Sequence, residues 1–525
     1  MTDQRLAVTA FALLFTGLFH SCKSYHRNES HAQVAQSSIE KGEVLARKHC
    51  QSCHALPDPS LLDARSWEQG VLPQMGPRLG IFHYDFSSYP SYKNDSFLDP
   101  HYYPAQPVLT YDEWQHIIDY FTATSPDSLP GQKRPVAIKN GLPLFEVHLA
   151  ENSGTAPMAS LVKINTAPAQ PPLMLYDLFK NQLYGFNRQL APTDSVPVAG
   201  AIVGIEEEQS GLLACNIGQI NPNNGSWGQV QRLYKNSADA WQLNSAAMIQ
   251  HLRRPVQVIA ADLNADAKQD YLVCEFGFLM GSLSWYENRG GEDSFTRHVL
   301  KPLPGAIKAY VQDYNQDGLP DIWVLLAQGE EGVFLYTNKG SGQFEEKQVL
   351  RFPPVQGSTY FELADFNKDG YPDIVYTCGD NADYSEVLKP YHGVYIYLND
   401  GKNHFRQVFF YPVNGCFKVL ARDFDGDGDL DLATISFFAD YARQPEEGFV
   451  YFENLGNFKF QPYSFTESKL GRWLTMDAGD LDGDGKTDLV LGNFSARPSR
   501  IPSKTDWKQG PWFIYLKNKG PQKNQ

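Results

Sequence analysis

Apolar and polar positions follow two different periods along the chain. Between residues 37 and 130 the apolar side chains recur every three or four positions, as they do at Trp114, Ile117, Ile118 and Phe121. This spacing places them on one face of a helix. From about residue 140 to residue 520, apolar runs of strand length alternate with Asp- and Gly-rich turns. The pattern predicts a small all-α region followed by a larger all-β region.

The two predicted helices that flank the helical region carry start signals. Ser37 and Glu40 match a capping box in "SSIEKGEVLARKHC", and Thr110 and Glu113 match another in "TYDEWQHIIDYF". The segment 81–109 between them is rich in Tyr and Pro and is predicted either to cover a bound group or to dock on the β-rich region.

Five loops in the β-rich region share the rule D-x-[DN]-x-D-[G]-x-x-D. Oxygen ligands at alternate positions of a tight loop can surround one hard cation, and Gly at the sixth position permits the turn. A strand-like run follows each loop, so the pattern predicts calcium loops in β-hairpins, with up to five Ca²⁺ in a structural role. The predicted ligands are Asp262, Asn264, Asp266, Asp270, Asp313, Asn315, Asp317, Asp321, Asp365, Asn367, Asp369, Asp373, Asp423, Asp425, Asp427, Asp431, Asp480, Asp482, Asp484 and Asp488.

The first residues of successive loops are 51, 52, 58 and 57 positions apart. A second motif with Asn and Gly follows each loop, so one repeat has room for about four strands, the size of a propeller blade. The motif set resembles FG-GAP (VCBS-type) repeats, and the resemblance implies a calcium-bearing β-propeller over residues 140–520. We expect seven blades, with six or eight as alternatives, and two blades without the loop at about 145–200 and 201–255.

The stretch "HCQSCH" contains a C-x-x-C-H motif at Cys50, Cys53 and His54. Two thiols at this spacing can form thioethers with haem, and the adjacent His can bind the iron. Zinc would need a second ligand pair, and a thioredoxin-like motif would lie in a βαβ pattern. Residues 37–130 therefore resemble a monohaem cytochrome c with one covalent haem c. Met75 is the predicted second iron ligand, with His83, His101 and His116 as rivals.

The first 22 residues predict export. Arg5 precedes an apolar run of signal-peptide length, which is short for a membrane-spanning helix. The run ends in "FHSC", which resembles a lipoprotein signal and implies that Cys22 is lipidated; a plain signal peptide is the alternative. Residues 23–36 are polar and aperiodic, as expected of a tether. We expect a lipid-anchored protein in the periplasm or at the outer membrane.

The composition limits the classes of binding partner that we expect. The formal net charge is −15, which argues against nucleic acid, and the mean hydropathy of −0.40 argues against a protein with several membrane spans. Four further cysteines, at positions 215, 274, 378 and 416, show no metal-ligand spacing. We expect them to be buried small hydrophobic residues or to form a disulfide.

The expected function is electron transfer by the haem, with the propeller as a binding or docking platform. The partner would be a redox protein or a respiratory-chain component, and the propeller could also bind a glycan or a small molecule. One alternative is an oxidoreductase of the sugar or alcohol dehydrogenase type, whose propeller passes electrons to its own haem, with His392 as a weak candidate base. A second alternative is a surface binding or adhesion protein.

Overall fold

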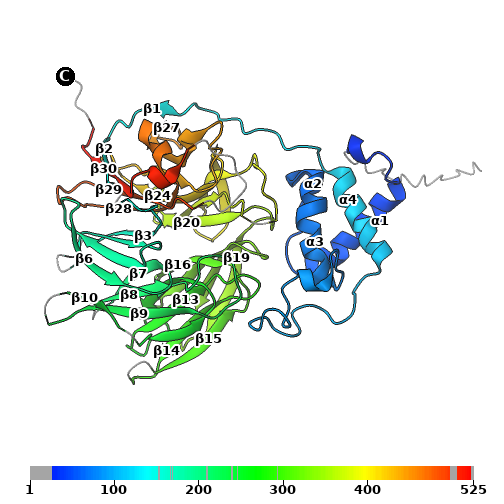
Figure 1. Cartoon of the computed structure of the whole chain (residues 1–525), viewed down its shortest axis with the longest axis horizontal. Helices are drawn as coiled ribbons and strands as arrows, with labels where there is room; N and C mark the ends of the chain where they lie inside the picture. Colours follow the sequence, from blue (N-terminus) through cyan, green and yellow to red (C-terminus); the bar gives the residue numbers. More distant parts are fainter. Residues whose placement is uncertain are drawn as a thin grey trace, which may run out of the picture.

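The computed structural model describes residues 27–521, apart from 152–153, 166, 168–169, 209–210, 238–239, 245, 292–293, 383 and 497–504. It consists of a small helical region and a ring of seven β-sheets (Figure 1). The proposed signal peptide and Cys22 lie outside the described residues.

The helical region is built around two longer helices, α1 (Gln36–His49) and α4 (Tyr111–Thr124). The chain between them forms short helical turns. These are η2 (Cys50–Ser52), η3 (Pro59–Leu61), α2 (Ala64–Ser66), the π-turn η4 (Trp67–Val71), α3 (Leu72–Met75), η5 (Gly76–Leu79) and η6 (Phe86–Ser88).

The capping box of α4 is confirmed, and that of α1 is wrong. Thr110 accepts a hydrogen bond from the backbone of Glu113, whose carboxylate accepts one in return. Helix α1 begins one residue before Ser37, with Ala35 as an N-cap that has no side-chain hydrogen bond. Part of the predicted tether is also ordered, because η1 (Glu29–His31) follows Asn28, which is buried and donates to Ser125 of the segment after α4.

Helices α1 and α4 cross at Gly42. A β-carbon there would overlap the backbone oxygen of His116, so only a residue without a side chain allows this approach. Ile39, Ile117 and Phe121 are buried, and Trp67 packs on Phe121 with ring centroids 4.5 Å apart. The apolar faces expected from the sequence form this core.

Each of the seven sheets is one propeller blade. Blade 1 contains β3 (Ala159–Ile164), β4 (Leu173–Asp177), β5 (Gln182–Phe186) and β6 (Pro192–Pro197). Blade 2 contains β7 (Ile202–Glu208), β8 (Gly211–Asn216), β9 (Gly228–Lys235), β10 (Trp241–Leu243) and β11 (Ile249–Leu252). Blade 3 contains β12 (Pro255–Ala261), β13 (Asp270–Glu275), β14 (Ser282–Asn288) and β15 (Phe295–Lys301). All strands within these sheets are antiparallel to their neighbours.

Blades 4 and 5 contain β16 (Ala306–Gln312), β17 (Asp321–Leu326), β18 (Gly332–Asn338) and β19 (Phe344–Arg351), then β20 (Ser358–Ala364), β21 (Asp373–Cys378), β22 (Gly393–Asn399) and β23 (Phe405–Pro412). Blade 6 contains β24 (Cys416–Arg422), β25 (Asp431–Ser436), β26 (Phe449–Asn454) and β27 (Phe460–Ser464). Blade 7 contains β28 (Trp473–Gly479), β29 (Asp488–Asn493) and β30 (Phe513–Asn518). Short turns η7 (Pro445–Gly448), η8 (Thr466–Leu470) and η9 (Trp507–Gln509) lie in the loops of the last two blades.

The ring closes by pairing the two ends of the propeller chain. Strand β2 (Phe145–Leu149) is antiparallel to β30 and completes blade 7, and β1 (Lys139–Asn140) adds to blade 6 in parallel with β27. Residues 145–149 therefore belong to the last blade, not to the first as the sequence suggested. The first blade without an Asp loop starts at Ala159.

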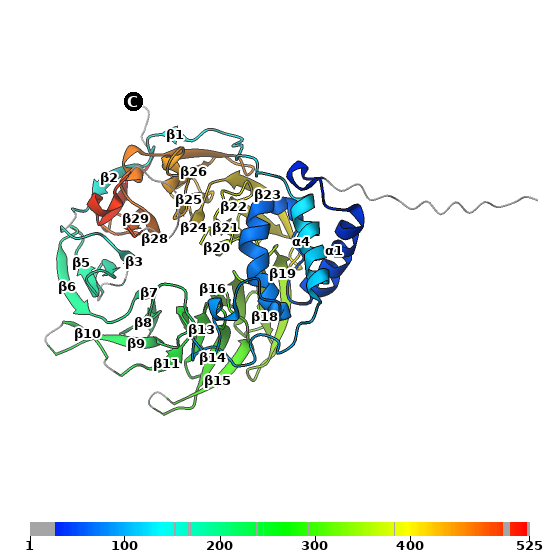
Figure 2. The same cartoon turned by 45° about the vertical axis from the view of Figure 1, so that its right-hand side comes forward.

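The alternation of strands places the loops on two faces. In a four-stranded antiparallel blade, the loops after the first and third strands lie at one end, and those after the second and fourth lie at the other. All five Asp loops follow first strands. The helical region contacts loops of the opposite set, because Val355 and Val387 pack against its core. Figure 2 shows α1 and α4 in front of the ring near β18, β19 and β23.

We expect Gly42→Ala to lower the free energy of unfolding of the helical region by about 1–3 kcal/mol, because the added methyl group overfills the helix crossing. An exposed helical glycine would instead gain up to about 1 kcal/mol from this change. The measurement is thermal unfolding followed by the helical circular dichroism signal. Gly131→Ala is the control, since nothing lies within 4 Å of its added carbon. An unchanged or raised midpoint for Gly42→Ala would contradict the close crossing.

Candidate functional site

The C-x-x-C-H residues lie where α1 ends. Cys50 and Cys53 are free thiols, half-buried and exposed respectively. Burial, together with the neighbouring Cys53, raises the pKa of the Cys50 thiol to about 11. The Nδ1 of His54 lies 2.8 Å from the carbonyl oxygen of Ala55, a hydrogen bond that holds the ring and leaves Nε2 available as a ligand. Burial lowers the pKa of His54, which favours the neutral imidazole that binds metals.

Met75 lies on the same core as the motif. It is half-buried at the end of α3, and both Met75 and Cys50 pack against the hydrophobic cluster of the helical region. Of its rivals, His83 and His101 are exposed, and His116 forms a 2.6 Å hydrogen bond with the Ser38 hydroxyl. Free thiols, an imidazole with one free nitrogen and a partly exposed thioether suit a covalently bound haem, so the residues present fit that group.

Two arginines border His54 from different parts of the chain. The positive charges of Arg351, at the end of β19, and Arg78, in η5, both lower the pKa of His54, after the larger effect of burial. The guanidinium of Arg78 lies 4.4 Å from the ring centroid of Tyr102. A positive environment at this position favours an anionic group beside His54.

The helical region is fixed to the propeller by specific contacts. The hydroxyl of Tyr391 donates to the carbonyl oxygens of Leu61 (3.3 Å) and Val355 (3.1 Å). Residues of the segment 81–109 contact the loop after β8, where Asn224 donates to Asp95 at 2.8 Å and Phe97 packs on Trp227. This segment therefore docks on the propeller, one of the two roles expected from the sequence.

The five Asp loops share one backbone arrangement. In each, a carboxylate oxygen of the first Asp accepts from the backbone nitrogen of the sixth residue at 2.8–3.1 Å. Three carboxylates converge within 4.8 Å of one another at Asp423, Asp425 and Asp427, and again at Asp480, Asp482 and Asp488. The loops that start at Asp262, Asp313 and Asp365 have Asn at the third position and so contribute fewer charges. The two all-Asp loops could hold a cation most strongly.

The ninth Asp of each loop has a further role that the sequence analysis missed. It begins the second strand of its blade and is fully buried, and one of its oxygens accepts from the backbone nitrogen of an Asn at the end of the third strand. The five pairs are Asp270–Asn288, Asp321–Asn338, Asp373–Asn399, Asp431–Asn454 and Asp488–Asn518, all at 2.7–2.8 Å. We call these pairs the Asp–Asn locks.

Each lock extends to both neighbouring turns. The Asn side-chain oxygen accepts from a Gly nitrogen two residues later at 2.8–3.1 Å. Its amide donates to the carbonyl that precedes the ninth Asp. Burial raises the pKa of every ninth Asp, to about 7 for Asp431. The Asn of each lock was visible in the sequence, because it belongs to the Asn- and Gly-containing motif that follows each Asp loop.

His392 lies in the interior of blade 5, fully buried. Within the described part of the chain neither ring nitrogen makes a well-formed hydrogen bond, although the backbone of Gln356 lies close enough to favour protonation slightly. Burial holds the pKa of His392 well below its usual range. The nearby Lys389 is also buried and donates to Asn381 at 2.7 Å. This environment is that of a core residue.

The remaining cysteines, Cys215, Cys274, Cys378 and Cys416, are buried free thiols, as one of the two expectations held. Among the residues that the structure describes, no helix has both the length and the apolar character needed to cross a membrane.

Comparison with known proteins identifies a known repeat within the propeller. Residues 262–324 and 313–376 match the model of the FG-GAP-like repeat. Cartilage acidic protein 1 of Mus musculus is 24% identical over 334 residues, which cover 55% of this chain and 49% of the relative. A T-cell immunomodulatory protein homolog of Plasmodium falciparum is 30% identical over 141 residues, which cover 24% and 19%. The chain spans about half the length, or less, of these curated relatives.

Among solved structures, a periplasmic gluconolactonase of Pseudomonas aeruginosa aligns with a TM-score of 0.40 and 12% identity, over 61% of this chain and 94% of that chain. The chain thus carries FG-GAP repeats in a seven-bladed propeller, as expected from the Asp-loop spacing.

We expect Asn338→Ala to lower the free energy of unfolding of the propeller by about 1–3 kcal/mol, because it leaves buried backbone groups without partners. The Asn338 amide also donates to Leu263 of the preceding blade at 3.0 Å, so the loss affects two blades. Urea unfolding monitored by tryptophan fluorescence measures the change. Gln343→Ala, in the exposed turn of the same hairpin, is the control. Equal stabilities of the two variants would show that the side-chain hydrogen bonds of Asn338 contribute nothing.

Proposed function

We propose that the protein is an exported binding protein whose calcium-stabilised propeller docks a partner and whose helical region carries one covalent haem c that transfers single electrons. The binding role is supported by the FG-GAP repeats and by the similarity to cartilage acidic protein 1. The haem rests on one observation: two free thiols and a histidine with a free Nε2 lie together at the end of α1.

The chain's own residues have distinct parts in this proposal. Cys50 and Cys53 would hold the haem covalently, and His54 and Met75 would bind its iron. The group supplies reversible one-electron chemistry when bound. The hydrogen bond from His54 to Ala55 orients the imidazole, and the core around Ile39 and Trp67 keeps water from one side of the site.

Calcium would bind in the Asp loops, on the face away from the helical region. Its proposed role is structural, because the loops join the first and second strands of their blades. A bound calcium ion would also neutralise the carboxylates of a loop and so relieve the repulsion between them. The loops starting at Asp423 and Asp480 are the preferred sites, since each converges three carboxylates. The partner on the propeller would be a redox protein, a respiratory-chain component or a glycan-bearing surface. Export and the lipid anchor at Cys22 belong to the same proposal.

A second candidate is a surface binding protein without redox activity, and it is favoured by the relatives found for the propeller. It shares the calcium-bearing propeller and differs only in the helical region. The presence or absence of covalent haem separates the two. The dehydrogenase alternative gains no support from His392, which lies inside blade 5.

When the full chain is produced in a host that matures c-type haem, we expect one haem to stay attached after denaturation. The oxidised spectrum should be that of a six-coordinate low-spin iron with a sulfur ligand. Met75→Ala should lose the sulfur signature, and Cys53→Ala should lose one of the two covalent bonds, whereas Cys215→Ala should behave as wild type. Protein that leaves this host with both thiols free would exclude the haem and support the non-redox candidate.

Calcium at a hundred times its dissociation constant should stabilise the propeller by about 2.7 kcal/mol for each site that is lost on unfolding. Thermal unfolding with calcium and with chelator measures this effect. Asp427→Asn should reduce it and remove one site from a calorimetric titration. Asp429→Asn makes the same charge change in the same loop, but its side chain faces Lys368 outside the cluster, so it should bind as wild type. Equal binding by both variants would contradict a site in this loop.

A further inference from the structure

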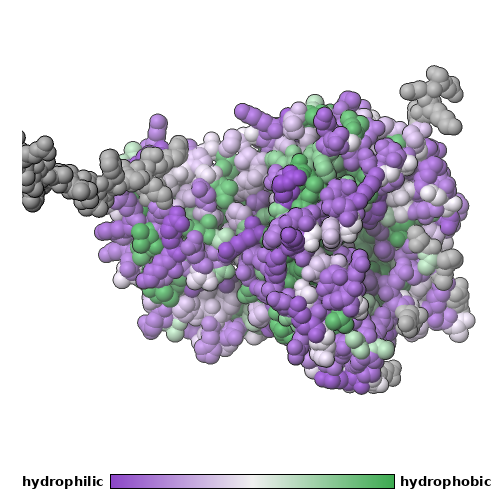
Figure 3. Space-filling view, turned by 180° about the vertical axis from the view of Figure 1, so that it is seen from behind, coloured by the Kyte–Doolittle hydropathy of each residue, from purple (hydrophilic) through white to green (hydrophobic). Residues whose placement is uncertain are grey.

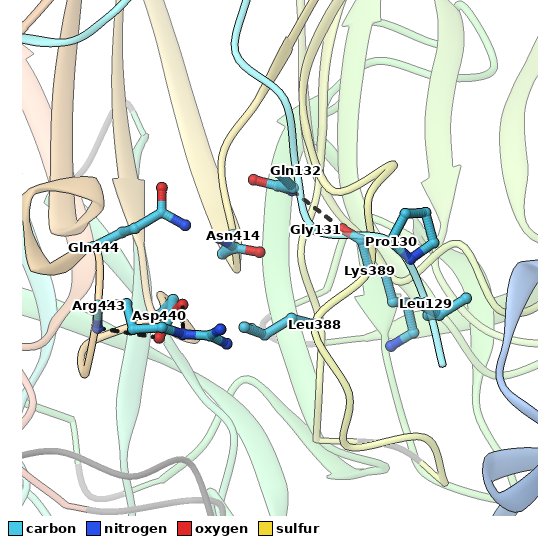
Figure 4. A pocket seen from close by; sticks show the side chains of 10 residues that line it. All are labelled: Leu129, Pro130, Gly131, Gln132, Leu388, Lys389, Asn414, Asp440, Arg443 and Gln444. Carbon is cyan, nitrogen blue, oxygen red and sulfur yellow. Dashed lines mark hydrogen bonds and ion pairs between the residues drawn. The ribbon is translucent and has the colours of Figure 1, made fainter. Parts of the chain in front are cut away.

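A cavity of about 240 Å³ lies where the chain passes from the helical region to the propeller. One wall is the connecting segment itself, at residues 129–132, and the other walls are loops of blades 5 and 6 (Figure 4). Three residues of the lining are apolar: Leu129 and Pro130 of the connecting segment, and Leu388, which Figure 4 shows beside Arg443. The polar residues of the lining include Lys389, Asn414, Asp440, Arg443 and Gln444.

The walls are held in place by interactions that do not use the cavity. The amide nitrogen of Gln132 donates to the backbone oxygens of Lys389 (3.1 Å) and His392 (2.8 Å), which fixes the connecting segment on blade 5. Two residues later, Arg134 pairs with the fully buried carboxylate of Glu447 in blade 6. Such fixed walls make the cavity a preformed feature of the fold.

Several polar groups of this cavity remain without a protein partner. The Oε1 of Gln132 is buried and accepts no hydrogen bond among the described residues. Figure 4 shows this oxygen directed away from Lys389, toward the side where Asn414 and Gln444 lie. The amide of Asn414 donates to Glu447, so its own oxygen is left, and the Gln444 amide has no partner in the described residues. A buried acceptor without a donor, such as the Oε1 of Gln132, is destabilising, and a ligand hydroxyl that donates to it would remove that cost.

Charge decides what kind of ligand fits. Asp440 and Arg443 form a 2.9 Å ion pair, and the ammonium of Lys389, which also lines the cavity, donates to Asn381 and to the carbonyl oxygen of Ser385. The charged groups of the lining therefore already have partners within the protein. The groups left are the amide oxygens of Gln132 and Asn414, which accept from hydroxyl groups, and the side-chain amide of Gln444, whose oxygen accepts and whose nitrogen donates. Leu129 and Leu388 line the same cavity. A neutral ring with hydroxyl groups on its edge and C–H groups on its face suits both kinds of lining residue.

We propose that this cavity is a binding site for a neutral monosaccharide or a sugar unit of a glycan. Gln132, Asn414 and Gln444 bind its hydroxyl groups, and Leu129 and Leu388 contact its ring. The inference gives a ligand class to the binding role proposed above and rests on it. It is independent of haem and calcium. The face of the molecule seen in Figure 3 is mainly hydrophilic, with apolar side chains in small separate groups.

The test is isothermal titration of the full, calcium-loaded chain with four probes: glucose, galactose, mannose and N-acetylglucosamine. At least one should bind saturably, with a dissociation constant of about 1 mM or lower. Gln444→Leu should weaken that binding about 3- to 10-fold, as expected for one lost hydrogen bond. Gln407→Leu, on the exposed side of β23, is the matched control and should bind as wild type.

A second variant tests the location. Gly131 lines the cavity and has open space around it, so Gly131→Trp should fold and abolish binding. Lack of saturable binding of all four sugars at about 10 mM would overturn the proposal. Binding that neither Gln444→Leu nor Gly131→Trp changes would overturn it as well, because the sugar would then lie elsewhere. In both cases the haem spectrum and the calcium titration would be unaffected, so failure here differs from failure of the proposed function.

Discussion

The buried hydrogen bond between the ninth Asp of each loop and the Asn of the third strand is the interaction on which the propeller depends. It joins the loop after the first strand to the turn after the third, on one face of the ring. A buried carboxylate is costly unless it is hydrogen-bonded, and each lock ties the start of the second strand to the end of the third. The lock is repeated in five successive blades, and in the loops of Asp423 and Asp480 three carboxylates also lie within 4.8 Å of one another. Any calcium would therefore bind to a shape that the protein has already formed.

The opposite face carries the contacts that differ from blade to blade. There the loops of blades 2, 4 and 5 receive the helical region through Asn224, Val355 and Tyr391. The connecting segment then crosses blades 5 and 6 and delivers β2 to blade 7, where it closes the ring. One segment thus links the C-x-x-C-H region, the cavity and ring closure. A change in the conformation of this segment would affect the C-x-x-C-H region, the cavity and the closure of the ring.

Much of the architecture could be predicted from local signals in the sequence. The five Asp loops and their spacing gave the repeat length, from which seven blades followed, and the capping box at Thr110 marked the last helix. Ala35 could not be predicted as the start of α1, because a cap without a side-chain bond leaves no sequence signal. The placement of β2 in blade 7 also depends on contacts between distant segments, which no local pattern records.

In the candidate sites, too, local features could be predicted from the sequence and contacts between distant segments could not. The order of Cys50, Cys53 and His54 is local and was evident, as were the five Asp loops. The Asp–Asn locks join residues up to thirty positions apart, so the two motifs that contain them showed the residues but not their pairing. The cavity combines three separate segments and follows from no motif. His392 stood out in the sequence as a polar residue in a long loop, but in the folded chain its side chain is fully buried.

The central claim is that one iron centre and a calcium-bearing ring belong to the same rigid protein. X-ray anomalous scattering from crystals of the matured chain, recorded at the iron edge, tests it most directly. The account predicts one iron peak between His54 and Met75, joined by continuous density to Cys50 and Cys53, with weaker calcium peaks in the loops of Asp423 and Asp480. Free thiols and no iron peak in protein from a host that matures haem would contradict it, and would leave a propeller that binds without transferring electrons.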